Sequence, residues 1–279
     1  MPQSKKNRPE KATILVPGFS IDTIDTVLYY AVPVAKVFGA SISFLIMGDD
    51  FLLNLFKENL NKKASGLIDD GSIKLIPYSS SFVYTPVIEK NDDDEEAIMV
   101  IFPQMPLGNF IKEMKFMLHV RKLRLPYMIL QPENADKKWK SQTVIVPVGF
   151  RRTDKEAAIW ASYFARFNNS KIIILFAKEK DAVADRDTRM NVRFMLNLFQ
   201  DLKITPEVVA GKSSSGKLHN EAVIMANEQE NSLVLITSTK HYGIEHYVFG
   251  SMELQTIKNK QKIPVLCVNP RKDLYVLCR

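Results

Sequence analysis

The chain has 279 residues, of which 46% are hydrophobic and 25% are charged, and this length suits two globular domains of roughly 140 residues each. No apolar run approaches the roughly 18 residues that a membrane span requires, and the basic residues at the start precede no apolar stretch of the kind found in signal peptides. We therefore expect a cytoplasmic protein with no membrane partner.

The net charge of +7 is carried mainly by the second half of the chain. Residues 1–140 hold 18 Lys and Arg against 17 Asp and Glu, whereas residues 141–279 hold 20 against 14, a difference of +6. This excess favours an anionic ligand in the second half. It lies on scattered lysines rather than on a basic stripe with interleaved aromatic residues, so we expect no nucleic-acid partner.

In the first half, apolar runs of strand length alternate with segments of helical periodicity. Between the third and fourth expected strands, where an amphipathic helix would complete the pattern, the sequence has the acidic run 92–96. Neighbouring carboxylates on one strand or helix cannot all face one cation, so we interpret this run as a solvated loop and not as a metal site. The expected strands are 12–16, 42–47, 73–76, 98–102 and 127–130, and the expected helices are 27–38, 51–60 and 109–123.

The second half opens with the run 143–148, which is continuously apolar and β-branched, as in strands that are buried on both faces of a parallel sheet. Thr153 and Glu156 then form the sequence pattern of a capping box. The helix that follows has apolar residues at i, i+3, i+4 and i+7 from Ala157 on one face. Five strands alternating with four helices indicate a parallel, doubly wound α/β sheet. The other expected strands are 172–176, 206–210, 232–236 and 264–268, and the other expected helices are 190–202, 218–230 and 251–259.

The chain repeats itself at a constant offset. Val16-Pro17 recurs as Val146-Pro147, and segment 35–42 recurs as 165–172, both 130 positions later (146 − 16 and 165 − 35). A constant offset across two separate elements predicts two copies of one α/β unit. The predicted organisation is a first domain at 1–132, a polar linker at 133–140 and a second domain at 141–279.

The offset grows along the chain. It is 134 at the fourth strand, from Val100 to Val234, and 138 at the fifth, from Pro126 to Pro264. The last four added residues lie between the fourth strand and the final helix. The second copy therefore has the longer loop at the carboxyl end of its sheet, where doubly wound folds bind their ligands.

Two glycine-containing loops in the second copy are candidate phosphate sites. The loop from Gly211 to Leu218 has the G-x-x-x-x-G-K layout, but Leu218 stands where a Ser or Thr would reach Mg²⁺, so we interpret it as a polar turn before a helix. In the loop from Thr237 to Ser251, the amides of a helix start, the Ser251 hydroxyl and nearby Lys240 would form a seat for phosphate. Gly250-Ser251 would equally serve as a turn and an N-cap, and both interpretations stay open.

Taken together, the residues resemble the universal stress protein family. The resemblance rests on two β-Val-Pro-helix-β units, on Gly250-Ser251 opening the last helix and on the closing segment 262–268, and it is stronger over 141–270 than over 12–132. It implies two tandem doubly wound five-stranded parallel-sheet domains of the adenine nucleotide alpha hydrolase-like fold, joined through their fifth strands as an intramolecular pseudo-dimer. A homodimer of the chain is a further expected partner. The alternative fold is another member of this wider group, such as an electron-transfer flavoprotein-like or pyrophosphatase domain.

Many members of the family bind ATP through G-x-x-G, nine residues and G-[S/T], helped by an acidic residue after the first strand. Carried over to this chain, Thr237 and Lys240 replace the first two glycines, and Gly149 replaces the acidic residue. The first copy lacks the acidic residue too, and its loop 103–108 lacks the Gly-Ser end, so the resemblance implies a degenerate first domain. The nucleotide-binding residues that the resemblance implies are Pro147, Val148, Gly149, Thr237, Lys240, Gly250 and Ser251.

We expect binding rather than catalysis. Neither cysteine has a histidine at metal-ligand spacing, and no nucleophile motif is present, so we expect no catalytic residues and no metal site. The resulting hypothesis is a stress-response, ligand-sensing protein whose second domain weakly binds ATP with Mg²⁺ or another adenine nucleotide. The alternatives are a nucleotide-free interaction protein and slow ATP hydrolysis. The four histidines, none in a His-Glu-x-x-His pattern, are His119, His219, His241 and His246.

Overall fold

The computed structural model describes residues 12–17, 20–47, 50–69, 72–78, 97–105, 110–131, 139–239 and 252–270. Within them, strands alternate with helices in both halves of the chain, as the sequence predicts. The acidic run 92–96 lies outside the described residues. The strands of the first half are β1 (Thr13–Pro17), β2 (Ser41–Met47), β3 (Ile73–Tyr78), β4 (Ala97–Phe102) and β5 (Tyr127–Ile129). Its helices are α1 (Ile24–Phe38), which follows the short 3-10 helix η1 (Ile21–Thr23), α2 (Asp50–Asp69) and α4 (Phe110–Val120).

The second half has the same kind of alternation. Its strands are β6 (Thr143–Val148), β7 (Lys171–Phe176), β8 (Glu207–Ala210), β9 (Ser232–Thr237) and β10 (Val265–Val268). Its helices are α5 (Ala157–Asn168), which follows the 3-10 helix η2 (Asp154–Glu156), α6 (Ala182–Asp201), α7 (Ser215–Asn227) and α9 (Met252–Ile257).

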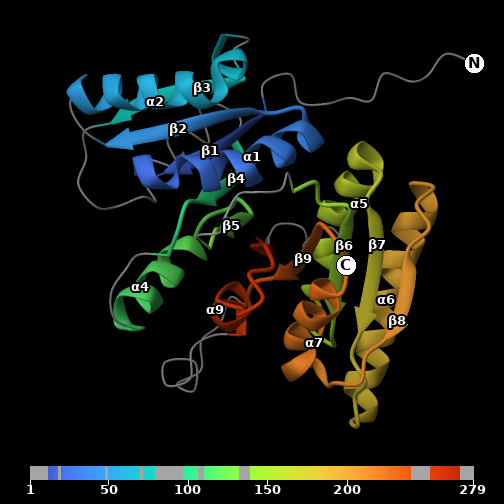
Figure 1. Ribbon diagram of the computed structural model, residues 1–279. Helices are drawn as coiled ribbons and strands as arrows, with labels where there is room; N and C mark the ends of the chain where they lie inside the picture. Colours follow the sequence, from blue (N-terminus) through green and yellow to red (C-terminus); the bar gives the residue numbers. More distant parts are fainter. Residues whose placement is uncertain are drawn as a thin grey trace, which may run out of the picture.

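These strands form one sheet in the order β3-β2-β1-β4-β5-β10-β9-β6-β7-β8. Within each half the neighbouring strands are parallel, and the first strand of the half lies between its second and fourth. The halves join where β10 pairs with β5 in antiparallel fashion, with Leu266 opposite Met128 and Cys267 opposite Tyr127. The two segments expected to pair as fifth strands therefore pair within the chain. Figure 1 shows the first half, drawn blue to green, beside the second, drawn yellow to red.

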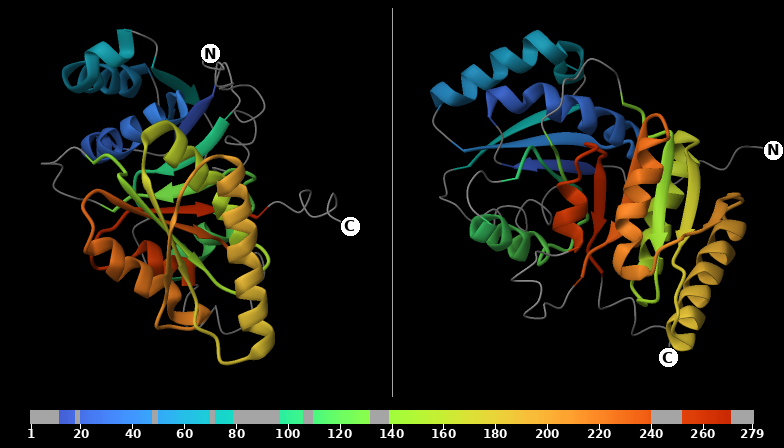
Figure 2. Two further views of the ribbon diagram at one scale, coloured as in Figure 1. Left: turned by 90° about the vertical axis from the view of Figure 1, so that its right-hand side faces the viewer. Right: turned by 60° about the horizontal axis from the view of Figure 1, so that its bottom comes forward.

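Helices cover both faces of the sheet. On one face α1, α2, α5 and α6 pack against strand residues such as Ile14 and Val146. On the other, α4, α7 and α9 pack against the alternate residues Leu15 and Ile145. Successive strand residues point to opposite faces, so strands covered on both sides are apolar throughout. In the right-hand view of Figure 2, α1 and α2 lie above the strands of the first half and α4 lies below them.

Two side chains that follow the paired strands bind the opposite half. The Gln131 amide, after β5, donates to the carbonyl of Ile257 at the end of α9. The Asn269 amide, after β10, lies 3.0–3.1 Å from three carbonyl oxygens, one in the last residue of α4 and two in the segment that follows it. Gln131 and Asn269 are 138 positions apart (269 − 131), the offset that the sequence shows at the fifth strand. Each half therefore satisfies the carbonyls at the other half's helix end. The three acceptors of Asn269 belong to Val120, Leu123 and Leu125.

Two ion pairs also join α4 and α9, and with the β5–β10 pair they make up what we call the seam. Arg121, just after α4, pairs with Glu253 in α9, and these side chains are 6% and 0% exposed. Lys258, just after α9, pairs with Glu113 in α4 at 2.8 Å, and these side chains are 51% and 14% exposed. The seam therefore has one buried ion pair and one at the surface.

The expected linker 133–140 has a buried residue, Trp139, next to its end. The indole N–H of Trp139 donates to the carbonyl of Ser232 in the second half at 3.1 Å. The Trp139 ring lies 5.3 Å, centroid to centroid, from the ring of Tyr30 in α1. The linker is thus anchored to both halves at its end, while residues 132–138 lie outside the described part of the chain.

Two of the helix starts that differ from the expectation depend on capping. The Thr153 capping box is wrong: Thr153 has helical φ and ψ (−74° and −24°) and makes no side-chain cap bond, and η2 precedes α5 instead. A cap residue needs an extended backbone to direct its oxygen at the free amides. Helix α6 begins at Ala182 rather than near 190, because the Asp181 carboxylate accepts from the amides of Val183 and Ala184.

Candidate functional site

The carboxyl ends of β6 and β9 bring several of the predicted site residues together. Pro147 and Gly149 line a cavity of about 220 Å³, and the carbonyl of Thr237 faces the same region from the end of β9. Val148 does not contribute to the site, because its side chain is buried in the hydrophobic core. Lys240, Gly250 and Ser251 lie outside the described residues. The other residues that line the cavity are Phe150, Arg151, Asp154, Ser215, Gly216, Leu218, His219 and Met252.

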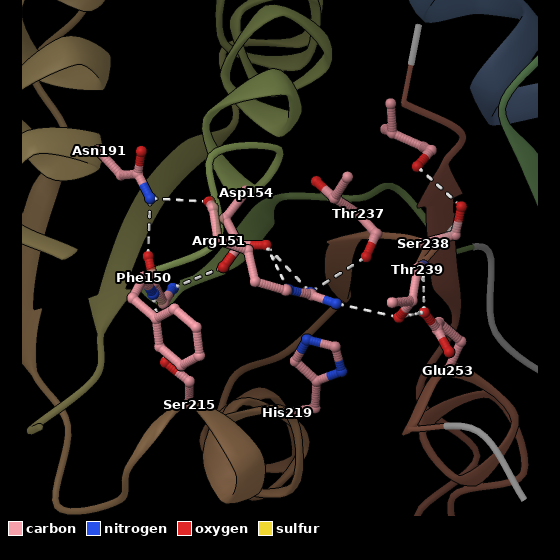
Figure 3. A network of polar contacts seen from close by, with 12 residues as sticks. Phe150, Arg151, Asp154, Asn191, Ser215, His219, Thr237, Ser238, Thr239 and Glu253 are labelled. Atoms are coloured by element: carbon pink, nitrogen blue, oxygen red, sulfur yellow. Dashed lines mark hydrogen bonds and ion pairs between the residues drawn. The ribbon is translucent and has the colours of Figure 1, made fainter. Parts of the chain in front are cut away.

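The side chain of Arg151 spans the carboxyl ends of strands β6 and β9. Its Nε and Nη2 lie 3.0 Å from Oδ1 of Asp154. Its Nη1 donates to the Thr239 hydroxyl at 3.0 Å and its Nη2 to the Thr237 carbonyl at 3.3 Å. Figure 3 shows this guanidinium between Asp154 on one side and the end of β9 on the other. Arg151, the cation in the cavity lining, is therefore already engaged by the protein itself.

Asp154 supplies a carboxylate where the resemblance led us to expect none. The amide of Gly149, at the position of the family's acidic residue, donates to Asp154 Oδ2 at 2.9 Å. Burial raises the pKa of Asp154 above its usual value, because it outweighs the lowering by Arg151 and by the Gly149 amide. The acidic group at this edge thus comes from five residues further along the chain.

Gly149 is required by close packing rather than by its backbone angles. A Cβ at this position would lie 2.2 Å from Ser215 Oγ and 2.8 Å from Ser215 Cβ. Ser215 is held there by Glu179, which accepts from the Ser215 amide at 2.8 Å and from its hydroxyl. An aspartate at position 149 would therefore clash with the start of α7.

Glu253 binds the first residues after β9. Its carboxylate accepts from both the amide and the hydroxyl of Thr239, and from the guanidinium of Arg121 across the seam. Burial raises the pKa of Glu253, but Arg121 and the Thr239 hydroxyl lower it by more, so its pKa lies below the usual value. A fully buried carboxylate is thus kept ionised beside the loop that the sequence predicts as a phosphate seat.

His219 of α7 lines the cavity as a neutral side chain. It is buried, and its Nδ1 lies 3.3 Å from the Thr256 hydroxyl. Burial and the nearby charge of Arg151 lower the pKa of His219 to about 4, although Glu253 acts in the opposite direction. At neutral pH this ring can accept or donate a hydrogen bond but carries no charge.

The loop from Gly211 to Leu218 forms a turn, as we interpreted it. Two amides of this loop, those of Lys212 and Ser213, donate to the Glu221 carboxylate at 2.8 and 2.9 Å. The following helix begins at Ser215, three residues earlier than expected. Here too a carboxylate of the chain takes the place that an anionic ligand would need.

Other features of the described residues lie away from this edge. A larger hollow of about 620 Å³ between α4, α7 and α9 is lined by Phe110, Val223 and Ile224 among others, and by none of the predicted site residues. Within the described ranges, no three His, Cys, Asp or Glu side chains gather in a way that would hold a metal ion. Over the same residues, no helix combines the length and apolarity needed to cross a membrane.

Comparison with known proteins identifies the second half. The model of the universal stress protein family matches residues 140–269. The match assigns residues 140–269, and not the whole chain, to this family. No curated protein matches the sequence.

Solved structures extend the likeness in fold to nearly the whole chain. A universal stress protein from Archaeoglobus fulgidus DSM 4304 is 15% identical with a TM-score of 0.57, and the match covers 94% of this chain and 97% of that one. A functionally unknown protein from Pseudomonas aeruginosa PAO1 is 11% identical with a TM-score of 0.61, covering 97% and 96%. The cytoplasmic domain of a prokaryotic cation chloride cotransporter is 8% identical with a TM-score of 0.55, covering 95% and 99%. At such identities these matches show the fold alone.

Proposed function

We propose that the chain is a stress-response, ligand-sensing protein that binds without turnover, and that its second half binds an adenine nucleotide weakly. The family match in the second half supports this proposal. The observation that carries it is the cavity at the carboxyl ends of β6 and β9, which has Pro147, Gly149 and Arg151 in its lining. In doubly wound folds this edge of the sheet is where ligands bind.

Weak binding follows from the contacts that a nucleotide would have to replace. Arg151 would exchange Asp154 and Thr239 for a phosphate, and the Thr239 amide is held by Glu253. The cavity of about 220 Å³ is also below the roughly 300–1,000 Å³ of pockets that enclose a ligand of drug size. A nucleotide therefore gains new contacts only by breaking existing charge-assisted ones.

The second candidate is a nucleotide-free interaction protein. It is favoured by a feature that three separate places share, since the amides of Gly149, Lys212 and Thr239 each donate to a carboxylate of the chain. If these contacts persist in solution, no amide at these places is left for a phosphate. The protein would then act through its surfaces.

Calorimetric titration of the full chain with ATP and Mg²⁺, and with AMP and adenosine, distinguishes the two candidates. We expect binding in the millimolar range and a raised thermal midpoint at about 5 mM ligand, because a ligand that binds only the folded state stabilises it. Arg151→Gln is expected to abolish the effect, and Arg152→Gln, a change of an exposed neighbour, is the matched control. The absence of heat and of stabilisation would favour the nucleotide-free candidate.

We propose binding without hydrolysis, and a phosphate-release assay tests this point separately. Release that Arg151→Gln abolishes and Arg152→Gln preserves would contradict it.

We also interpret the halves as tandem copies that form an intramolecular pseudo-dimer. This interpretation is supported by the equal strand order of the halves and by the reciprocal contacts of Gln131 and Asn269. The expected homodimer and the cytoplasmic location stay predictions. Light scattering of the purified chain tests the first of these.

A further inference from the structure

The donors that surround Glu253 come from three groups on two halves of the molecule. The amide and hydroxyl of Thr239 reach it from the end of β9, and the guanidinium of Arg121 reaches it from the end of α4. The Glu253 side chain is 0% exposed, so water does not compete for these donors. A partly buried amide and hydroxyl and a buried guanidinium that donate to the same carboxylate form an anion-binding site.

The same donors are those that proteins use to bind phosphate. An arginine fork matches carboxylate and phosphate equally well in geometry, and amides and hydroxyls donate to either. Thr239 also belongs to the loop from 237 to 251, which the sequence predicts as the phosphate seat. The carboxylate of Glu253 thus lies where the anionic part of a ligand would find its donors.

Charge is balanced along the whole row of contacts. Asp154 binds Arg151, Arg151 binds the Thr239 hydroxyl, Thr239 binds Glu253, and Glu253 binds Arg121. The row contains two carboxylates and two guanidiniums, and the His219 ring beside it is neutral at pH 7. No net positive charge is therefore left in this row to attract a phosphate group.

We propose that Glu253 is a built-in substitute for the anionic group of a ligand, and that it sets the specificity of the second-half site against phosphorylated ligands. This inference rests on the proposed function, because it concerns the same site. It assigns the ligand class: a neutral adenine nucleoside is expected to bind the unaltered protein at least as tightly as ATP. A phosphate that binds Thr239 would meet the Glu253 carboxylate, which accepts from the same residue, and buried like charges repel strongly.

The test compares Glu253→Ala with Glu113→Ala. Both changes remove the acidic partner of an α4–α9 ion pair, but only Glu253 touches Thr239. Thermal unfolding and calorimetry are measured for each variant and for the unaltered chain, with inorganic phosphate and with ATP as probes. Both probes are expected to bind Glu253→Ala at least about tenfold more tightly than the unaltered chain, and Glu113→Ala no more tightly.

Glu253→Ala leaves Arg121 without this carboxylate and is expected to be less stable. If it is unfolded after purification, recovery of its folded signal on titration with phosphate is itself the measurement. Glu253→Gln, which keeps the shape and removes the charge, gives a second measurement, with tighter phosphate binding again expected.

The outcomes separate this inference from the proposed function. Phosphate binding by Glu253→Ala without any ATP binding would support the inference and contradict nucleotide binding. Equal binding of ATP by the unaltered chain and by both Glu253 variants would overturn the inference and leave the proposed function standing. An equal gain in phosphate binding by Glu253→Ala and Glu113→Ala would also overturn the inference.

Discussion

The two ion pairs of the seam join the same two helices but lie in different surroundings. Arg121 and Glu253 are nearly enclosed, whereas Lys258 is half-exposed beside Glu113. The buried pair also contacts Thr239 at the candidate site, while the exposed pair is at the rim of the seam. The comparison teaches that two ion pairs between the same helices differ in energy, and in their contact with the candidate site, according to their burial.

The largest effect is expected from Arg121→Ala. This change leaves the Glu253 carboxylate buried without its cation, and loss of one partner of a buried pair lowers the free energy of unfolding by about 3–5 kcal/mol. Urea denaturation measures it. The double variant Arg121→Met, Glu253→Met is expected to recover much of the loss, since a well-packed apolar pair can replace a buried ion pair. A loss as small as that of the exposed pair would break the comparison.

Two glycines at the cavity extend the contrast between crowded and open surroundings. Gly149→Ala is expected to lower the free energy of unfolding by about 1–3 kcal/mol, because its Cβ would lie 2.2 Å from Ser215 Oγ. Gly216→Ala is the matched control, since a Cβ there meets nothing within 4 Å, and it is expected to be neutral or stabilising in helix α7. Thermal unfolding of both variants measures the difference. If the additional change Ser215→Gly restores the thermal stability of Gly149→Ala, the clash lies between these two residues.

The dependence of stability on pH tests the burial of His219. The pKa of His219 is lowered to about 4, so its contribution to stability is complete above the ordinary value of 6.5 and is lost as pH falls towards 4. Between pH 7 and pH 5 this amounts to about 2 kcal/mol. The pKa of Asp154 is raised, so its protonation stabilises the folded state as pH falls, opposite to the effect of His219. The contribution of His219 is therefore isolated by comparing a His219 variant with the unaltered protein.

His219→Gln is expected to flatten the fall in urea midpoint between pH 7 and pH 5. His119→Gln, a change of an exposed histidine on α4, is the control and is expected to leave that fall as it is. An equal slope in the His219 variant and the unaltered protein would contradict the assignment.

The smallest effect is expected from Lys258→Ala. Its ion pair with Glu113 is exposed, and such pairs stabilise proteins by at most about 1 kcal/mol, less in high salt. Urea denaturation at low and high ionic strength measures it. A loss of stability comparable with that of Arg121→Ala would show that burial does not distinguish the two ion pairs of the seam.

The sequence predicted the strands and their pairing well, because these depend on local patterns. The run 143–148 is apolar at every position and forms β6 with the bounds expected. The resemblance implies that the fifth strands, in segments 127–130 and 264–268, join the halves, and β5 and β10 pair with each other. The start of α6 was missed because its first turns are polar, and the apolar pattern becomes readable only near Met190.

The polar contacts of the site could not be predicted in the same way. Arg121 and Glu253 are 132 positions apart, and nothing local in either segment indicates the other. The missing acidic residue at Gly149 suggested a site without a carboxylate, yet Asp154 reaches the Gly149 amide from the following loop. A position-by-position comparison with the family motif misses this carboxylate, because Asp154 and not residue 149 supplies it. The Arg151 to Asp154 spacing of three was the only local signal in the sequence.

The pairing of β5 with the last strand has a consequence for how the chain is made on the ribosome. Strand β5 ends at Ile129 and β10 begins at Val265, so 136 residues (265 − 129) are synthesised before the partner of β5 exists. At about 5–20 residues per second, this delay is about 7–27 s. During that interval the nascent first half presents an open strand edge to other polypeptides, and chaperone protection of the growing chain matters most then.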